Sequence, residues 1–209
     1  MKLSTIDDLI HATLMVKVRV MSLQQIASAF HGGDVSNANR RLRRLVSAGI
    51  LAKHNLIARR APVPTGPIQI WDPGCPTPNF ESLSRSVKRR WQRTATRPTT
   101  VFVAARRFAS SVGKRTLGRL SHPLQVSHDL GLSSVYLHLW DVQPVAALRW
   151  VGEDSFPQSS RKKQSPDAFL MGINMVPERA IEYAGFYDAK RFKKFHSYCF
   201  NRGLSFDIY

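Results

Sequence analysis

The chain has 209 residues, of which 43% are hydrophobic and 10% aromatic, and this composition excludes general disorder. No apolar run approaches the roughly 18 residues that a membrane span needs, and the N-terminus lacks a signal-peptide pattern. The two cysteines, Cys75 and Cys199, lie far apart and outside any CxxC motif, which argues against a cysteine-rich zinc site. We therefore expect a cytoplasmic protein without a membrane partner.

The net charge of +17 is concentrated in the first part of the chain. Residues 1–120 contain 21 Lys and Arg against 5 Asp and Glu, whereas residues 121–209 contain 10 against 9. Positive charge concentrated in one part of a protein indicates a polyanionic partner. Because no basic segment also has a strong lipid-binding apolar face, double-stranded DNA is favoured over an anionic membrane.

Three helices are expected in the first fifty residues. The first has apolar residues along one face from Thr5 to about Val16. The second, SLQQIASAF, begins with serine and glutamine at capping-box spacing. The turn HGGDV then leads into the third helix, SNANRRLRRLVSAG, which is capped by Asp34 or Ser36. A short helix, a glycine turn and a basic helix are typical of a helix-turn-helix.

The third predicted helix has an apolar inner side and a polar outer side. The outer side is formed by Ser36, Asn37, Arg40, Arg43, Arg44 and Ser47. Arginine and asparagine side chains read guanine and adenine edges or hold phosphates. A solvated basic face is the alternative interpretation, but the position after a capped helix and a glycine turn favours DNA recognition.

Two strand-like stretches, ILAKHNLIARR and PIQIW, follow the third helix and are joined by the proline-rich tip APVPTG. They predict the β-hairpin wing of a winged helix-turn-helix domain over residues 1–72. Arg59 and Arg60 lie near the predicted wing tip, where we expect phosphate contacts.

Residues 73–120 are expected to form a basic, proline-containing linker and connector. The turn-rich stretch DPGCPTP precedes NFESLSRSVKRRWQRTATR, a cationic helix with one apolar stripe that includes Trp91. This helix either packs as a connector or contacts phosphates, and one helix can do both. Its candidate phosphate-binding residues are Lys88, Arg89, Arg90 and Arg93.

Residues 121–209 predict an α/β domain. The expected elements are a helix over 121–141, strands over 146–153, 167–173 and 179–184, a helix over 187–203 and the closing strand LSFDIY. This αβββαβ order is similar to the core of the restriction-endonuclease-like superfamily. The expected fold class is therefore a two-domain α+β and α/β protein, with a winged helix followed by a nuclease-like domain.

Pro-Asp followed by a distant glutamate is also found in that superfamily, where the carboxylates hold Mg²⁺ or Mn²⁺. Magnesium prefers hard oxygen ligands and needs only one or two carboxylates. Asp167 and Glu182 are therefore the candidate metal ligands and catalytic residues, and Glu153 is a candidate third oxygen donor.

The motif lysine of such nucleases is absent, because its position holds Ala184. Helical projection places Lys190 and Lys194 toward solvent, whereas Arg191 and His196 border the buried stripe and are able to lean toward the carboxylates. Without the lysine charge, the sequence favours DNA binding over catalysis.

The chain resembles the replication-relaxation family of plasmids and integrated mobile elements. The matching stretches, in order, are the helix around residues 37–49, WDPGCPTP, VSHDLGLSSVYL, PDAFL, IEYAGFYDAKRFKKFH and GLSFDIY. The resemblance implies a DNA-binding protein that assists replication, integration or mobilisation. The family pattern at Glu182 is close to Glu-Tyr/Phe-Gly-Gly, so the resemblance also implies that the missing lysine is usual in the family.

Three functions remain open on the sequence. The favoured one is double-stranded DNA binding, directed by sequence or structure, in replication, mobilisation or transcriptional control of a mobile element. The second is a Mg²⁺- or Mn²⁺-dependent endonuclease, which is the one function that would require a cofactor. The third is a DNA-bound adaptor for a protein partner. A homodimer and replication or mobilisation proteins are the candidate protein partners.

Overall fold

The computed structural model describes residues 2–59, 63–108, 120, 123–155 and 165–209. The protein is of mixed α/β class and forms two compact units. Unit 1 consists of Met1–Ala61 and Thr96–Leu137, and unit 2 of Pro62–Ala95 and His138–Tyr209. The chain therefore does not divide at residues 72 and 120 as expected, because a segment of unit 2 is inserted into unit 1. No helix among the described residues combines the length and apolar character needed to cross a bilayer.

Unit 1 begins with three helices, as the sequence predicts. Its elements are α1 (Thr5–Ala12), a π-helix (Thr13–Lys17), β1 (Met21–Ser22), α2 (Leu23–Phe30), α3 (Val35–Ser47), β2 (Leu51–Arg59), β4 (Thr96–Ala104), a 3-10 turn (Arg106–Phe108) and most of α5 (Pro123–Val142). The capping box of α2 is confirmed, since the Gln25 amide donates to Ser22 Oγ at 3.2 Å and the Ser22 amide to Gln25 Oε1 at 2.8 Å. Asp34 caps α3 by accepting from the Asn37 amide at 2.9 Å.

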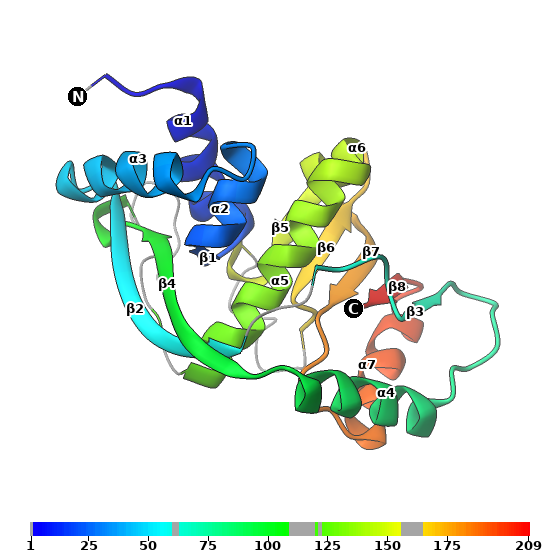
Figure 1. The fold of residues 1–209 in the computed structure, drawn as a ribbon. Coiled ribbons are helices and arrows are strands. Elements are labelled where there is room, and N and C mark those ends of the chain that lie inside the picture. Colours follow the sequence, from blue (N-terminus) through cyan, green and yellow to red (C-terminus); the bar gives the residue numbers. More distant parts are fainter. Residues whose placement is uncertain (1, 60–62, 109–119, 121–122, 156–164) are drawn as a thin grey trace. The chain divides into compact units, whose positions relative to one another are not determined.

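β4 is the central strand of the sheet in unit 1, whose order is β1-β4-β2 (Figure 1). β2 and β4 pair antiparallel in unbroken register from Leu51↔Ala104 to Arg59↔Thr96. The predicted hairpin of ILAKHNLIARR with PIQIW is therefore wrong. β3 (Gln69–Trp71) instead joins the sheet of unit 2. β4 offers β2 a partner for all nine of its residues, whereas β3 has only three.

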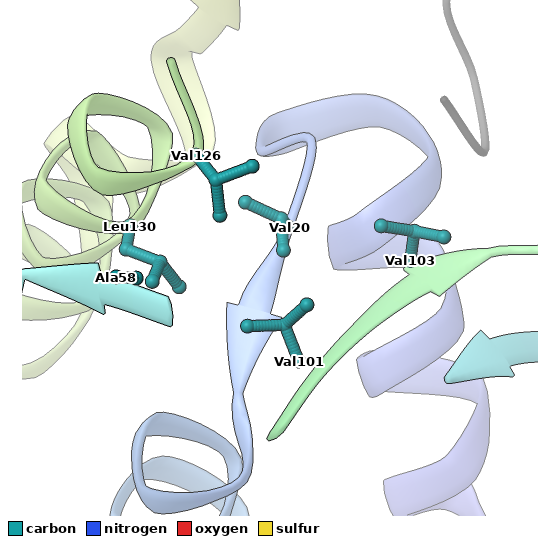
Figure 2. Packing of buried hydrophobic residues seen from close by; sticks show 6 residues of the cluster. All are labelled: Val20, Ala58, Val101, Val103, Val126 and Leu130. Atoms are coloured by element: carbon teal, nitrogen blue, oxygen red, sulfur yellow. The ribbon is translucent and has the colours of Figure 1, made fainter. Parts of the chain in front are cut away.

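One cluster of buried side chains in unit 1 joins its sheet to α5. Figure 2 shows its buried side chains Val20, Ala58, Val101, Val103, Val126 and Leu130. α5 is also hydrogen-bonded to unit 1, since Arg19 pairs with Asp129 at 3.1 Å and Gln25 Nε2 donates to the Leu130 carbonyl at 2.8 Å. The expected helix is confirmed. Its residues 123–137 belong to unit 1 and not to a C-terminal domain, because Val126 and Leu130 pack in the buried cluster of that unit.

Unit 2 contains the second sheet, of order β3-β8-β7-β6-β5. Its further elements are α4 (Phe80–Arg93), α6 (Pro144–Arg149), β5 (Trp150–Gly152), a 3-10 turn (Glu153–Ser155), β6 (Ala168–Met171), β7 (Pro177–Glu182), α7 (Ala189–Phe200) and β8 (Ser205–Ile208). β7 and β8 run parallel, and the other pairs are antiparallel. The predicted order of three strands, a helix and a strand is confirmed. The strand expected over 146–153 is shorter, because residues 144–149 form α6 with Pro144 at its first turn.

Candidate nucleic-acid interface and carboxylate cluster

The outer face of α3 consists of Ser36, Asn37, Arg40, Arg43, Arg44 and Ser47. All six residues are exposed, and Ala38, Leu42 and Leu45 on the opposite side are completely buried. Arg40 donates to Asn37 Oδ1 at 3.0 Å, so two of the predicted base-reading side chains are held together. Arg43 and Arg44 form no ion pair with any described part of the chain. The predicted outer face is therefore a polar surface with uncompensated positive charge.

Arg41 holds α3 against α1, a role that the sequence did not reveal. Its Nε donates to Asp7 Oδ1 at 2.7 Å, and its Nη2 donates to the other carboxylate oxygen of the same residue. The Asp7 side chain is fully buried. The hydrogen bond from Arg41 lowers the pKa of Asp7 to about 2, with further help from the Ser4 amide and hydroxyl. This ion pair fixes the orientation in which α3 presents its outer face.

A second arginine, Arg107 from the turn after β4, contacts the C-terminal end of α3. Arg107 donates to the Ala48 carbonyl at 3.1 Å, and its guanidinium would lie 3.3 Å from a Cβ atom added at Gly49. Gly49 has a φ of 67°, which is the left-handed conformation that favours glycine. A cation beside the last carbonyls of a helix is favourable. Because Arg107 is far from α3 in sequence, only the pairing of β2 with β4 brings it there.

The predicted wing-tip arginines do not lie at a hairpin tip. Arg59 ends β2, its backbone amide donates to Ser127 Oγ at 3.0 Å, and its side chain is half-buried. Arg60 lies outside the described residues. The phosphate contact at Arg59 was predicted because Arg59 was expected at the tip of a hairpin. β2 and β3 do not form that hairpin, so the prediction has no structural support.

Positive charge is divided between the two units. Unit 1 has 16 Lys and Arg against 4 Asp and Glu, a net +12, and unit 2 has 15 against 10, a net +5. The excess therefore favours unit 1, but less strongly than a division of the chain at residue 120 suggests. Both units carry the sign that attracts a polyanion.

The cationic helix α4 serves as a connector on one side and is exposed on the other. Leu83, Val87 and Trp91 are buried, and the Trp91 indole donates to the Ala184 carbonyl at 2.7 Å. Of the four candidate phosphate contacts, Lys88, Arg89 and Arg93 are exposed, and Arg90 is not.

Arg90 has a structural role instead. Its Nη2 donates to the carbonyls of Ala184 at 2.6 Å and Tyr209 at 3.1 Å, and its guanidinium lies 4.7 Å from the ring centre of Tyr183. These contacts stabilise the segment that follows β7, and they remove Arg90 from the candidate DNA contacts. Nothing in its local sequence distinguishes Arg90 from Arg89, because only the tertiary fold decides which of them turns toward the protein and which toward solvent.

The two candidate metal ligands lie opposite each other on neighbouring strands. β6 and β7 pair Ala168 with Ile181, so the next position in this register brings Asp167 beside Glu182. Both are buried, with 8% and 2% of their surface exposed. Asp167 Oδ2 accepts from the Tyr183 amide at 2.8 Å. The structure therefore brings the two candidate carboxylates side by side.

Tyr187 connects this pair to α7 and was missed in the sequence. Its hydroxyl donates to Glu182 Oε1 at 2.8 Å and accepts from Arg191 Nη2 at 2.7 Å. The guanidinium of Arg191 also lies 3.8 Å from the Tyr187 ring centre. Burial, followed by the charges of Glu182 and Asp167, raises the pKa of Tyr187, so it remains a protonated donor. Tyr187 therefore links Arg191 to the carboxylate of Glu182.

The remaining predicted members of the site form no metal-binding group with the pair among the described residues. The Glu153 amide donates to the Asp167 carbonyl at 2.9 Å, but no group of three His, Cys, Asp or Glu residues suited to a metal occurs among the described residues. Lys190 and Lys194 are exposed, as the projection predicts. His196 packs in an aromatic cluster, 4.7 Å from Trp71 between ring centres. The cluster offers two carboxylates, which fits the number that Mg²⁺ commonly uses.

Comparisons with known proteins add no neighbour: no family model, no curated protein and no solved structure matches the chain. Residue geometry and charge therefore carry the functional assignment.

Proposed function

We propose that the protein binds double-stranded DNA through the outer face of α3, in the manner of a winged helix-turn-helix domain. The observation that carries this proposal is an exposed row of arginine, asparagine and serine on a helix that buries Ala38, Leu42 and Leu45 on its other side. These side chain types supply both base-edge and phosphate contacts.

The topology of unit 1 supports the proposal. Its order α1-β1-α2-α3-β2-β4, with the sheet order β1-β4-β2, is the arrangement typical of winged helices. α3 has 13 residues and is therefore about 20 Å long, which suits a recognition helix in the major groove. In place of a short wing, the chain between β2 and β4 contains β3 and α4 of unit 2.

The biological setting is proposed from the sequence resemblance. A protein with this binding mode in the replication-relaxation family would act in the cytoplasm on a mobile element, in its replication, mobilisation or transcriptional control. The net charge of +12 on unit 1 supports a DNA partner for that role but does not distinguish between the three processes.

Selection of bound duplexes from a random library tests whether α3 reads bases. The wild-type protein should enrich a defined sequence, and Asn37→Ala or Arg40→Ala should relax the preference at one or two positions of that sequence. Each lost base contact should reduce affinity by about 1–3 kcal/mol at the preferred site. Lys53→Ala, an exposed cation on β2, is the matched control and should leave the preference unchanged. Enrichment that is identical in all four proteins would contradict recognition by α3.

A metal-dependent nuclease is the second candidate, because Asp167 and Glu182 are buried side by side at one end of the sheet. Two carboxylates could hold Mg²⁺ or Mn²⁺, which would activate water and neutralise charge at phosphorus. Two findings favour binding over cleavage: Ala184 stands at the position of the motif lysine, and most of the first helix of the expected αβββαβ core belongs to unit 1.

Plasmid nicking in Mg²⁺ or Mn²⁺ separates the two candidates. The DNA-binding account predicts no metal-dependent nicking by the wild-type protein. Nicking that is lost in both Asp167→Asn and Glu182→Gln, and retained in the exposed-residue control Lys53→Gln, would establish the nuclease.

A further inference from the structure

α4 and α7 pack against each other in unit 2 (Figure 1). The Phe80 ring at the start of α4 lies 5.5 Å from the ring of His196 in the second half of α7. Ser84 Oγ, one turn later on α4, donates to the carbonyl of Tyr187, just before α7 begins. The two helices therefore contact each other along α4, and both belong to one compact unit.

The exposed sides of these helices are strongly cationic. We define the α4–α7 face by its exposed members Arg85, Lys88, Arg89 and Arg93 on α4 and Lys190, Lys193 and Lys194 on α7. None of the seven forms an ion pair within the described residues. The acidic residues nearest in sequence are Glu81, in the first turn of α4, and Asp188, whose carboxylate caps α7 by accepting from the Arg191 amide at 2.7 Å.

The spacing of these cations opposes the stability of the helices. Arg85, Arg89 and Arg93 follow one another at intervals of four residues, as do Lys190 and Lys194. Like charges at this spacing repel each other, whereas a solvated helix face is stabilised by alternating signs. An external polyanion would remove this repulsion.

The buried sides of the helices argue for nucleic acid rather than lipid. Leu83, Val87 and Trp91 of α4 and Phe192 and Phe195 of α7 are all buried within the protein. A helix that lies on a membrane instead exposes an apolar side to the acyl chains. The cations on the α4–α7 face therefore have phosphate groups as their best-matched ligands.

We propose that the α4–α7 face is a second DNA-binding surface that contacts the phosphate backbone without reading bases. This inference rests on the proposed function, because it takes DNA as the partner. Its evidence is the exposed positive charge of unit 2 and does not involve α3. Two contact surfaces in one chain act at a high effective concentration, so the second surface raises affinity without adding sequence preference.

Salt dependence of duplex binding tests the inference in the full-length protein. Two triple variants each neutralise part of the α4–α7 face: Arg85→Gln with Arg89→Gln and Arg93→Gln, and Lys190→Gln with Lys193→Gln and Lys194→Gln. If each lost cation contacts one phosphate, the slope of log K against log salt should fall by about 2.7 in each variant. The salt-driven loss of affinity between 50 and 200 mM should then shrink by about 40-fold relative to wild type.

A charge-conserving control keeps the test specific. Lys190→Arg with Lys193→Arg and Lys194→Arg preserves all three charges and should keep the wild-type slope. The midpoint of thermal unfolding should not fall in the glutamine variants, because all the replaced side chains are exposed.

The outcomes separate this inference from the role of α3. If the glutamine variants lose the same DNA affinity on two unrelated duplexes, the result supports the α4–α7 face. A loss of affinity confined to one DNA sequence is expected only for α3 variants. An unchanged salt slope in both glutamine variants overturns the inference, whatever the α3 variants do. Loss of binding to phosphatidylserine vesicles, with DNA binding intact, would also overturn it and would identify a membrane surface instead.

Discussion

Replacing Asp7 by asparagine should lower the free energy of unfolding by roughly 2 kcal/mol at pH 7. The magnitude follows from the pKa of Asp7, which falls from 3.8 to about 2 because Arg41 donates to its buried carboxylate. Since the folded pKa lies below the unfolded one, this stabilisation is complete above the unfolded pKa and is lost as the pH falls through about 2. At pH 3, about half of it should remain.

Urea unfolding at pH 7 and pH 3 measures this difference. All four tryptophans belong to unit 2, so tryptophan fluorescence follows unit 2 and far-UV circular dichroism follows the whole chain. Asp7→Asn should shift the circular dichroism transition and leave the fluorescence transition in place. Arg43→Gln, an exposed arginine on the same helix, is the control and should have no effect.

Equal destabilisation by Asp7→Asn at pH 7 and pH 3 would refute the electrostatic reasoning, because a charge effect must decline with protonation. A double variant of Asp7→Asn with Arg41→Gln provides a second check. The two substitutions should be non-additive, since they remove the same ion pair.

Three further predictions concern unit 2. Tyr187→Phe should destabilise the protein by about 1–3 kcal/mol in urea unfolding, because it removes a buried hydrogen-bond donor to Glu182. An unchanged midpoint would remove this hydrogen bond from the account. Arg90→Gln should also lower stability measurably and leave the salt slope of DNA binding unchanged, since its guanidinium holds two backbone carbonyls. A reduced salt slope would return it to the phosphate contacts. At pH 8, a thiol reagent should modify exposed Cys75 alone in the native protein, because burial and then the Glu182 charge raise the pKa of Cys199 to about 12. Two labelled thiols by mass spectrometry would contradict this.

Local signals in the sequence predicted local structure well. The capping box of Ser22 and Gln25 and the outer face of α3 depend on spacings of three and four residues, and the structure confirms both. The paired carboxylates also followed from local order, because Asp167 and Glu182 lie on consecutive strands of one antiparallel pair.

Features that depend on distant partners could not be predicted in this way. PIQIW is the strand-like segment that follows β2 most closely in the sequence. β2 pairs with β4 instead, because β4 offers partners to nine residues. The sequence predicts the helix α5 without showing which residues it packs against, and Val126 and Leu130 pack with buried residues of unit 1. The structural roles of Arg41 and Arg90 likewise depend on contacts with residues 34 and 94 positions away in the sequence.

The affinity of the full-length protein for its selected duplex at one fixed salt concentration tests the central claim most directly. The account predicts that Arg40→Ala with Arg43→Ala binds this duplex at least tenfold more weakly than wild type, at about 1–3 kcal/mol for each base contact. Lys53→Ala, which removes an exposed cation of the same unit, should reduce the affinity for this duplex much less than the double variant does. Equal affinity of the wild-type and Arg40→Ala/Arg43→Ala proteins would contradict DNA recognition by α3.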